Sequence, residues 1–356
     1  MFLKRLDRYI AKTVLSTTLL VLLVLVGLFL FFTFIEELDE IGKGNYSTYH
    51  ALNYVFMMTP RRTYEFFPIA ALLGSLLGLG LLSNNSELTV MRASGVSIMR
   101  IGWSLIKVGL ALMVLVILLG ESIAPYAEQK AKNMRALAQS GQSALNTRHG
   151  LWARDGNNFI HIRRPDVGGQ LEEVTFYAFD KEQRLQQLTT ASSAFYYDKQ
   201  WVLEDIAQTH INGNQITGER LTWQERSEFP TPNLINVLTM EPSHLSTPEL
   251  YRYIDYLQQN NLHAAPYELS FWYRMIYPLT TIVSIFLALP FVFGSLRSVA
   301  VGQRILVGTL LGIVFYALNQ VMGHSALLYG INPLFSALLP TLLFFMLALL
   351  LMRRIF

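Results

Sequence analysis

The chain has 356 residues, of which 52% are hydrophobic and only 15% are charged. Soluble domains average about 25% charged residues, so this composition excludes a soluble enzyme with a single core and indicates a membrane protein. The net charge of +3 is too small to indicate a nucleic-acid-binding protein by itself. The absence of cysteine excludes disulfide scaffolds, thiolate metal sites and cysteine nucleophiles.

Six apolar runs along the chain are long enough to cross a bilayer. A spanning helix needs about 20 predominantly apolar residues, and helices satisfy their own backbone hydrogen bonds in lipid. The first run follows a basic N-terminus, but it is too long for a signal peptide and acidic residues follow it, so we expect a retained helix. The runs cover residues 13–35, 66–82 with a start as early as 54, 101–119, 271–293, 305–328 and 333–352.

Lysine and arginine in the short connecting segments predict the orientation of these helices. The basic segments are the N-terminus, residues 83–100, the segment around Gly294 and the C-terminal tail. Such segments stay in the cytoplasm, so we expect both termini on that side. By alternation, residues 121–270 lie outside; they carry 13 basic and 18 acidic side chains, which argues against binding of nucleic acid.

The long outside segment has the pattern of an all-β domain. Short stretches rich in aromatic and β-branched residues alternate with turn residues, which is typical of an antiparallel sandwich or jelly roll. After them, Ser246-Thr247-Pro248-Glu249 predicts a helix start with Thr247 as the cap. The predicted strands cover residues 151–152, 159–162, 174–179, 194–197, 201–203, 215–216 and 221–223.

These patterns predict the fold class and the domains. We expect an α-helical integral membrane protein with six transmembrane helices and an all-β, jelly-roll-like domain between helices three and four. The first part is residues 1–137, with a cytoplasmic helix in 84–100. The β-domain is 138–245, and residues 246–356 form an amphipathic linker helix and the last three spans.

No catalytic motif occurs in the sequence. Gly42-Lys43 lacks the earlier glycine and the following hydroxyl residue of a P-loop, so ATP hydrolysis by that route is excluded. No zincin helix, nucleophile elbow or dinucleotide fingerprint occurs in a suitable setting, and no two histidines have helical ligand spacing.

Two pairs of glycines are spaced four residues apart inside the apolar runs. They are Gly74 with Gly78, and Gly308 with Gly312. Small residues at this spacing let helices approach closely. They predict either packing within one chain or a contact with a second subunit or with lipid.

Residues 84–100 are too polar to span a membrane, yet Leu88, Met91 and Val96 give them a partly apolar face. Asn84 and Glu87 have the spacing of a capping box. The segment is therefore either an interfacial helix or a helix that docks into a groove of another protein, where Glu87 would meet a basic partner.

Four basic residues lie close to the outer ends of two runs. They are Arg61, Arg62, Lys132 and Arg135. Such side chains either snorkel to lipid head groups or, if several converge, bind a multiply phosphorylated amphiphile.

Several stretches, taken together in chain order, are characteristic of one family. They are Leu6-Asp7-Arg8-Tyr9-Ile10, Phe66-Phe67-Pro68, Ala70-Ala71-Leu72-Leu73-Gly74, Ser86-Glu87-Leu88, Ala93-Ser94-Gly95, Gly150-Leu151-Trp152-Ala153, Asp155-Gly156-Asn157-Asn158-Phe159, Phe293-Gly294 and Leu296-Arg297-Ser298-Val299. With the order of three spans, a β-rich domain and three more spans, they resemble the LptF/LptG permease family of the lipopolysaccharide exporter, in particular its LptG branch.

The resemblance implies an ABC transporter in the bacterial inner membrane. It implies a heterodimer with an LptF-like permease, an LptB-like ATPase dimer on the cytoplasmic face and an LptC-like single-span jelly-roll protein. Lipopolysaccharide would be extracted from the membrane and passed to a periplasmic jelly-roll bridge. The chain itself would be no enzyme and would bind no cofactor, because ATP and Mg belong to the partner ATPase.

The resemblance also implies site residues. Contact with the ATPase would involve Glu87, Leu88, Met91, Arg92, Ser94 and Gly95. The phosphates of the lipid would be bound by Arg61, Arg62, Lys132 and Arg135. For the acyl chains we expect an apolar wall made of Leu25, Phe29, Phe32, Phe67, Val314, Phe315 and Leu318. Family members place lysines late in the first span and just after it, where this chain has Thr33, Asp39 and Glu40.

Three alternatives remain open from the sequence. The chain could be an LptF-type subunit or a permease for another lipid. It could be a mechanical transmitter whose β-domain binds a partner while nothing crosses. A membrane-bound enzyme is the third, and the missing catalytic motifs disfavour it.

Overall fold

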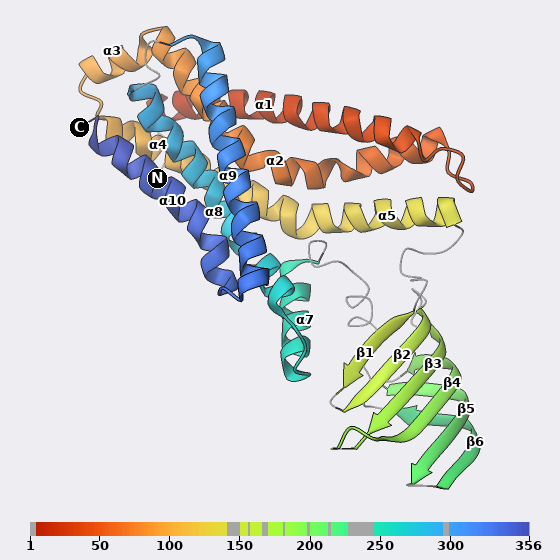
Figure 1. The fold of residues 1–356 in the computed structure, drawn as a ribbon. Helices are drawn as coiled ribbons and strands as arrows, with labels where there is room; N and C mark the ends of the chain where they lie inside the picture. Colours follow the sequence, from red (N-terminus) through yellow and green to blue (C-terminus); the bar gives the residue numbers. More distant parts are fainter. Residues whose placement is uncertain are drawn as a thin grey trace. The chain divides into compact units, whose positions relative to one another are not determined.

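The computed structural model describes residues 5–140, 150–155, 157–165, 170–180, 182–197, 200–212, 215–226, 245–294 and 299–355. Along the chain, helices come first, then six strands, then helices again (Figure 1). The contacts divide the chain into two compact units. The first holds Met1–Ile41, Ser47–Ala131 and Glu268–Phe356, and the second holds Gly42–Tyr46 and Lys132–Tyr267.

Among the residues that the structure describes, six helices are long and apolar enough to cross a membrane, which confirms the six predicted runs. Helix α4 continues without a break through the π-helical turn η1 into α5. A short helix, α3 (Glu87–Ala93), lies between the second and third of them. The bounds are α1 Arg5–Leu38, α2 Thr48–Asn84, α4 Ile98–Leu118, η1 Leu119–Ile123, α5 Ala124–Ser140, α8 Ala265–Phe293, α9 Val301–Tyr329 and α10 Pro333–Arg353.

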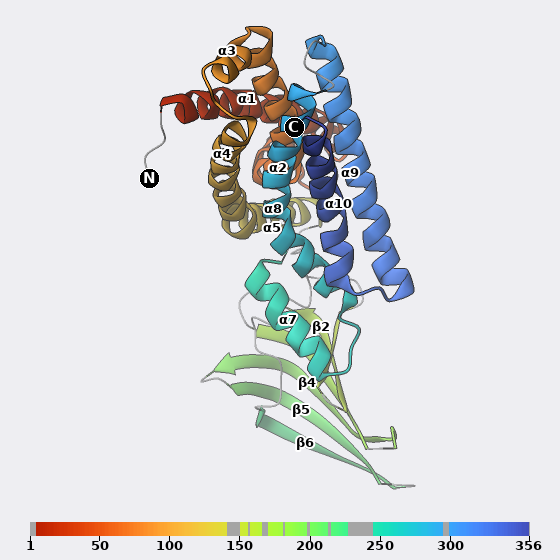
Figure 2. The same cartoon turned by 90° about the vertical axis from the view of Figure 1, so that its left-hand side faces the viewer.

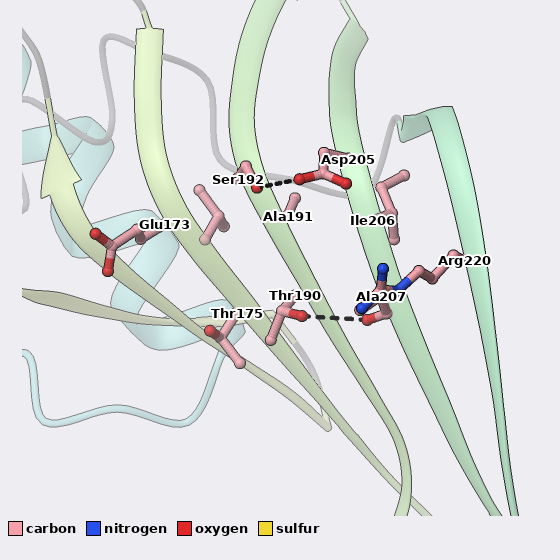
Figure 3. Close-up of a pocket in the computed structure, with 10 residues that line it drawn as sticks. Glu173, Thr175, Thr190, Ala191, Ser192, Asp205, Ile206, Ala207 and Arg220 are labelled. Atoms are coloured by element: carbon pink, nitrogen blue, oxygen red, sulfur yellow. Dashed lines mark hydrogen bonds between the residues drawn. The ribbon is translucent and has the colours of Figure 1, made fainter.

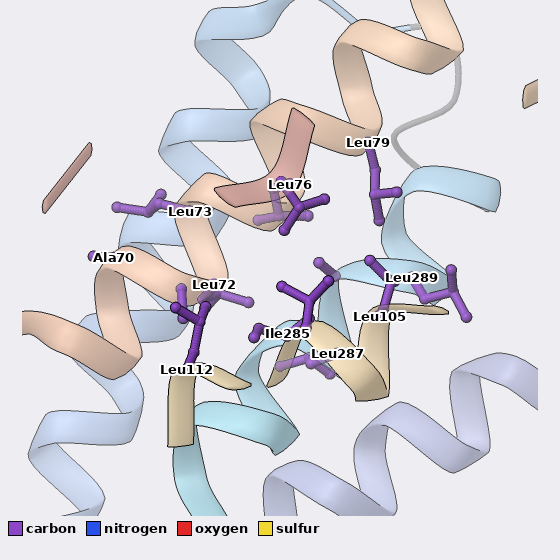
Figure 4. Close-up of a cluster of buried hydrophobic side chains, with 14 of the residues drawn as sticks. Ala70, Leu72, Leu73, Leu76, Leu79, Leu105, Leu112, Ile285, Leu287 and Leu289 are labelled. Atoms are coloured by element: carbon purple, nitrogen blue, oxygen red, sulfur yellow. The ribbon is translucent and has the colours of Figure 1, made fainter. Parts of the chain in front are cut away.

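The core of the helical unit lies where α2, α4 and α8 meet. Leu76, Leu105 and Ile285, one from each helix, are fully buried there, and Figure 4 shows them among other leucines of the same cluster. Because lipid is as apolar as leucine, close packing rather than escape from water holds such helices together.

Helices α1 and α2 pack through the first glycine pair. The Thr17 hydroxyl of α1 donates a hydrogen bond to the carbonyl oxygen of Gly74 at 2.7 Å. A Cβ on Gly74 would overlap the backbone of Thr18, and one on Gly78 would lie 2.6 Å from the Thr17 hydroxyl oxygen. This glycine pair therefore serves packing within the chain, which answers the alternative left open by the sequence.

Replacing Gly74 with alanine is expected to lower the stability of the helical unit. The new methyl group would push α1 away from α2, and overpacking of this kind costs about 1–3 kcal/mol. Gly27→Ala is the matched control, because a Cβ at Gly27 meets nothing within 4 Å. Thermal unfolding of the detergent-solubilised chain measures both variants; equal melting temperatures for them would contradict this packing.

The strands form one antiparallel sheet in the order β1-β2-β3-β4-β5-β6. An all-β domain was predicted and is confirmed; among the described residues its strands make a single sheet rather than two facing sheets. The predicted strands 215–216 and 221–223 are one continuous strand, because β6 runs through Gly218 beside β5. The bounds are β1 Leu151–Asp155, β2 Asn158–Pro165, β3 Gln170–Phe179, β4 Leu185–Tyr197, β5 Gln200–Asn212 and β6 Gln215–Arg226.

The pairing between neighbouring strands is interrupted at Glu173 in β3, Ser192 in β4 and Asp205 in β5. We call these three positions the line of missing pairs. The register is the same on both sides of the line, so no residue is inserted. Glu173 and Asp205 have positive φ angles of 53° and 48°, a conformation that is uncommon outside glycine. The strands curve along their length (Figure 2), and this line is where the regular pairing gives way.

Helix α7 (Thr247–Gln259) follows the sheet and belongs to the same unit. Its cap is Ser246, which forms a capping box with Glu249, so the prediction of Thr247 as the cap was wrong by one residue. The Tyr256 hydroxyl accepts a hydrogen bond from the Arg154 N–H at 3.1 Å and donates one to the Arg154 carbonyl oxygen at 2.6 Å. A side chain of α7 thus satisfies the backbone of Arg154 in β1, an edge strand of the sheet.

Candidate functional site

Helix α3 begins later than the capping pattern predicted. Helix α2 continues through Asn84, and Ser86 is the N-cap of α3 with a φ angle of 60°. Glu87 is therefore the first residue of α3 and not the third after an Asn84 cap. A carboxylate at this position is favoured by the partial positive charge of the helix N-terminus.

The residues predicted to meet the ATPase divide into two groups on α3 and the turn after it. Leu88 is only 3% exposed, and Met91 packs against the core, so these two hold α3 onto the helical unit. Arg92, Ser94 and Gly95 are exposed. The turn needs Gly95 because its φ angle is 85°.

A cavity of about 350 Å³ lies between α3 and the C-terminal end of α8. Apolar and polar side chains share its wall about equally, and Arg92 adds a positive charge. A cavity of this size can accept a side chain of another molecule. It is lined by Ser83, Leu88, Thr89, Arg92, Ala93, Val292 and Phe293.

Glu87 makes a hydrogen bond within the chain. Its Oε1 accepts a hydrogen bond from Asn85 Nδ2 at 3.4 Å. The carboxylate is half-buried. It is therefore held in place by the chain and is still accessible from outside.

Arg61 and Arg62, both predicted to bind phosphate, share a carboxylate of the same helix. Arg61 Nε lies 2.8 Å from Glu65 Oε1, and Arg62 Nη1 lies 2.6 Å from Glu65 Oε2. Arg61 Nε also lies 3.7 Å from Glu128 Oε2 of α5, and Glu128 is buried. With two carboxylates beside it, Arg61 is largely neutralised by the chain itself.

Arg62 connects the predicted phosphate site to the predicted acyl wall. Its guanidinium carbon lies 4.2 Å from the centre of the Phe29 ring of α1, a cation–π distance. Phe29 in turn packs against Phe66 at 5.5 Å between ring centres. Arg62 thus places a positive charge beside the aromatic surface of Phe29 and Phe66. This arrangement suits the boundary between a phosphorylated head group and its acyl chains.

Lys132 and Arg135 lie on the part of α5 that belongs to the second compact unit. They are three residues apart, so they share one face of the helix. Both are half-buried. This face of α5 therefore carries two basic residues about one helical turn apart.

The residues predicted for the acyl wall differ in how accessible they are. Phe67 is fully buried in the core, so it is a packing residue in this structure. Phe32 and Val314 are exposed. Leu25, Phe29, Phe315 and Leu318 are half-buried, and Phe315 packs against Phe344 of α10 at 5.0 Å between ring centres.

The sheet carries a second cavity of about 360 Å³ along the line of missing pairs (Figure 3). Ser192 donates a hydrogen bond to Asp205 at 2.8 Å within it. Glu173, Asp205 and Arg220 give the wall charged groups. An acyl chain would remove water from these charges without replacing it, so this cavity does not suit hydrocarbon.

Glu65→Gln is expected to increase the binding of phosphorylated lipid severalfold. The amide keeps the shape of the side chain and removes the negative charge that competes with phosphate for Arg61 and Arg62. Binding of a lipid with and without its phosphates, measured on the purified complex, tests this. Glu268→Gln at the start of α8 serves as a carboxylate control; an equal effect of both variants would contradict the competition.

Sequence reasoning missed Glu65 and Glu128. Glu65 could have been found, because it stands three and four residues after two arginines on one helix. Glu128 meets Arg61 only through the packing of separate helices, which residue spacing does not reveal.

The chain is similar to known proteins along nearly its whole length. The family described as lipopolysaccharide export system permease LptF/LptG matches residues 8–354. Lipopolysaccharide export system permease protein LptG of Escherichia coli K12 is 40% identical over 355 residues, which are 98% of each chain. The protein of that name from Haemophilus influenzae is 37% identical over 344 residues, 95% of each chain. With its six apolar helices and inserted β-domain, the chain belongs to the LptF/LptG family of lipopolysaccharide export permeases.

Proposed function

We propose that this chain is the LptG-type permease subunit of a transporter that extracts lipopolysaccharide from the inner membrane and passes it to a periplasmic jelly-roll bridge. The observation that carries the proposal is the match to permeases named LptG along 95–98% of both chains. An LptF-type subunit or a permease for another lipid is the runner-up, and neither relative favours it.

The proposed orientation places both termini and α3 in the cytoplasm and the β-domain in the periplasm. It rests on the basic residues of the short segments. In this orientation Glu87 faces an ATPase partner, while Arg62 and Phe29 lie toward the outer half of the membrane.

The proposed partners supply what this chain lacks. An LptB-like ATPase dimer binds ATP and Mg and docks at α3, where Glu87, Arg92 and the cavity beside Val292 offer a carboxylate, a cation and an apolar recess. An LptF-like permease completes the cavity in the membrane, and an LptC-like protein continues the bridge. The chain itself binds no cofactor in this account.

The amphiphile is held by two kinds of surface in this proposal. Phosphate groups are bound by Arg62, Lys132 and Arg135, since guanidinium and ammonium groups bind phosphate oxygens through charge-assisted hydrogen bonds. Acyl chains lie along α1 and α9, on side chains such as Phe29, Phe32 and Val314. Closure of the ATPase moves α3, and the rigid helices narrow the cavity and drive the lipid outward.

Reconstitution tests this function. Vesicles holding the chain with LptF-, LptB- and LptC-like partners should release lipopolysaccharide to a soluble jelly-roll acceptor only when ATP is present. Omitting this chain should abolish the transfer. ATP hydrolysis that responds to the chain without any lipid transfer would instead identify a mechanical transmitter.

A further inference from the structure

The first three strands of the sheet carry aromatic side chains on the face that is not packed into the core. Leu151 and Ala153 of β1 are buried in the apolar cluster of the sheet, so Trp152 between them points to the opposite face. A sheet with one buried face usually carries polar side chains on the other, whereas Trp152 is 55% exposed and Phe159 of β2 is 37% exposed. We call the set the aromatic face; it consists of Trp152, Phe159, His161, Tyr177 and Phe179. Exposed aromatic side chains gathered in one place indicate a binding surface.

Trp152 is stacked on two other members of the aromatic face. The centre of its ring lies 4.6 Å from that of His161 and 5.6 Å from that of Tyr177, and the ring planes differ by 30° and 26°. Strand β1 is at the edge of the sheet (Figure 1), so His161 in β2 and Tyr177 in β3 come from the same side of Trp152. More than half of Trp152 is nevertheless exposed. Its indole is thus held by its neighbours while much of its surface stays open to a ligand.

The strand that carries Trp152 is fixed, and it adds a positive charge beside the stack. The Tyr256 hydroxyl of α7 binds both the N–H and the carbonyl oxygen of Arg154. Arg154 follows Trp152 by two residues and shares its face. Its guanidinium carbon lies 5.2 Å from the centre of the Phe159 ring. A cation therefore stands at the border of the aromatic face on a strand that is held in position, which lowers the cost of ordering a binding site.

A sugar ring suits these features better than an acyl chain or a protein surface does. The face of an aromatic ring is negatively polarised, so it attracts the C–H groups on one side of a sugar, while the hydroxyl groups around the sugar keep their contact with water. An acyl chain has no such groups and is stabilised by complete removal from water, which an exposed stack does not provide. A protein partner needs about 800 Å² of surface, and the two exposed aromatic side chains supply at most about 150–250 Å² each. The guanidinium further favours a sugar that carries a carboxylate or a phosphate.

We propose that the aromatic face binds an acidic sugar residue of lipopolysaccharide, with Trp152 stacked on the sugar ring and Arg154 bound to its carboxylate or phosphate. The proposal rests on the proposed function, since export brings the saccharide part of this lipid to the β-domain. The β-domain then recognises the saccharide separately from α1 and α9, to which the acyl chains are assigned.

The first test is the binding of the acyl-free oligosaccharide that mild acid releases from lipopolysaccharide. Titration calorimetry measures it on the whole chain in detergent. Trp152→Ala should weaken binding about tenfold, as for other rings that stack on aromatic side chains, and Trp152→Phe, which keeps a ring, should retain most of it. Trp223→Ala is the matched control, because Trp223 is 62% exposed on β6 of the same sheet. Equal binding by the wild type and Trp152→Ala, or no binding by the wild type, would overturn the proposal.

Arg154→Gln tests the charge. The substitution keeps the backbone groups that Tyr256 binds. Added salt should weaken the binding of the oligosaccharide to the wild-type chain, because salt screens exposed charges. The variant should bind more weakly at low salt and respond little to added salt. The same salt response in both chains would overturn the assignment of Arg154.

Transfer by the reconstituted complex separates this proposal from the proposed function. Trp152→Ala should slow the transfer of lipopolysaccharide and leave unchanged the transfer of the lipid that remains once the oligosaccharide is removed; equal slowing of both would contradict a saccharide site. A wild-type complex that binds the oligosaccharide but transfers neither lipid would overturn the proposed function and leave the saccharide site standing. Normal oligosaccharide binding by Trp152→Ala, with loss of a bridge protein from the purified complex, would show that the aromatic face docks a protein instead.

Discussion

Glu87→Lys is expected to abolish ATP-driven lipid transfer while the chain still inserts into the membrane. The substitution puts a positive charge at the N-terminus of α3, which the helix dipole disfavours, and turns an attraction to a basic partner into repulsion. Loss of one member of a close charge pair at an interface costs about 2–5 kcal/mol, or thirtyfold and more in affinity. Recovery of the ATPase with the affinity-purified chain, together with ATP-driven transfer, measures the effect.

Two further variants separate the roles of Glu87. Glu87→Gln keeps the shape of the side chain and an acceptor for Asn85 but loses the charge, so it should weaken ATPase recovery. Gln303→Lys adds a positive charge at an exposed position on α9 and should recover the ATPase normally. Normal recovery and transfer by Glu87→Lys would refute the coupling role.

Neutralising Lys132 and Arg135 together is expected to weaken the binding of phosphorylated lipid at least tenfold. Each hydrogen bond to a charged group contributes about 1.5–3 kcal/mol, and 1.4 kcal/mol corresponds to a factor of ten. The measurement compares lipopolysaccharide with its dephosphorylated form on the complex carrying Lys132→Gln and Arg135→Gln. The dephosphorylated lipid should bind to this variant nearly as it does to the wild type.

Lys130→Gln is the matched control for this double variant. Lys130 is an exposed lysine on the same helix, two residues before Lys132, so it faces another direction. Equal losses for both lipids in the double variant would show that Lys132 and Arg135 merely reach toward head groups in general, as the snorkelling alternative holds.

The spanning helices were predictable because their signal is local. A continuous apolar run identifies a span without knowledge of its neighbours, and all six runs became helices. The start of α2 was placed too late, since Pro60, Arg61 and Glu65 interrupt the apolar pattern. In the structure the charges of Arg61 and Glu65 compensate each other, which lets the helix run from Thr48 through both of its prolines.

The sheet was predictable only in part. Residues 194–197 were predicted as a strand, whereas β4 begins at Leu185. Its first half is rich in threonine, serine and glutamine, and its place in the sheet comes from pairing with β3 and β5 on either side. Gly218, which looked like a break, is paired with Thr209 in the middle of a ladder. Tertiary pairing overrides local preference in such strands.

Some polar contacts of the site can be predicted from the local sequence, and others depend on tertiary packing. A carboxylate one turn from two arginines, such as Glu65, is visible in the sequence. Arg304 and Asn84, which are joined by a hydrogen bond, are 220 positions apart. Only the packing of α2 and α9 brings them together.

The two faces of the sheet offer the lipid two different routes through the β-domain. Phe176 points to the apolar face, whose side chains are buried, and Phe159 points to the opposite face and is exposed. Probes at these two positions therefore distinguish entry of acyl chains into the apolar interior from passage over the outer surface.

The measurement that tests the central claim most directly is photocrosslinking of lipopolysaccharide to probes at Phe29, Arg135, Phe159 and Phe176. It is made in vesicles holding the chain with its LptF-, LptB- and LptC-like partners. We expect adducts at Phe29 and Arg135 without ATP, and adducts in the β-domain, at Phe176 if the apolar interior opens, only when ATP is present. No adduct at any of the four positions, in vesicles with an active ATPase, would contradict the account.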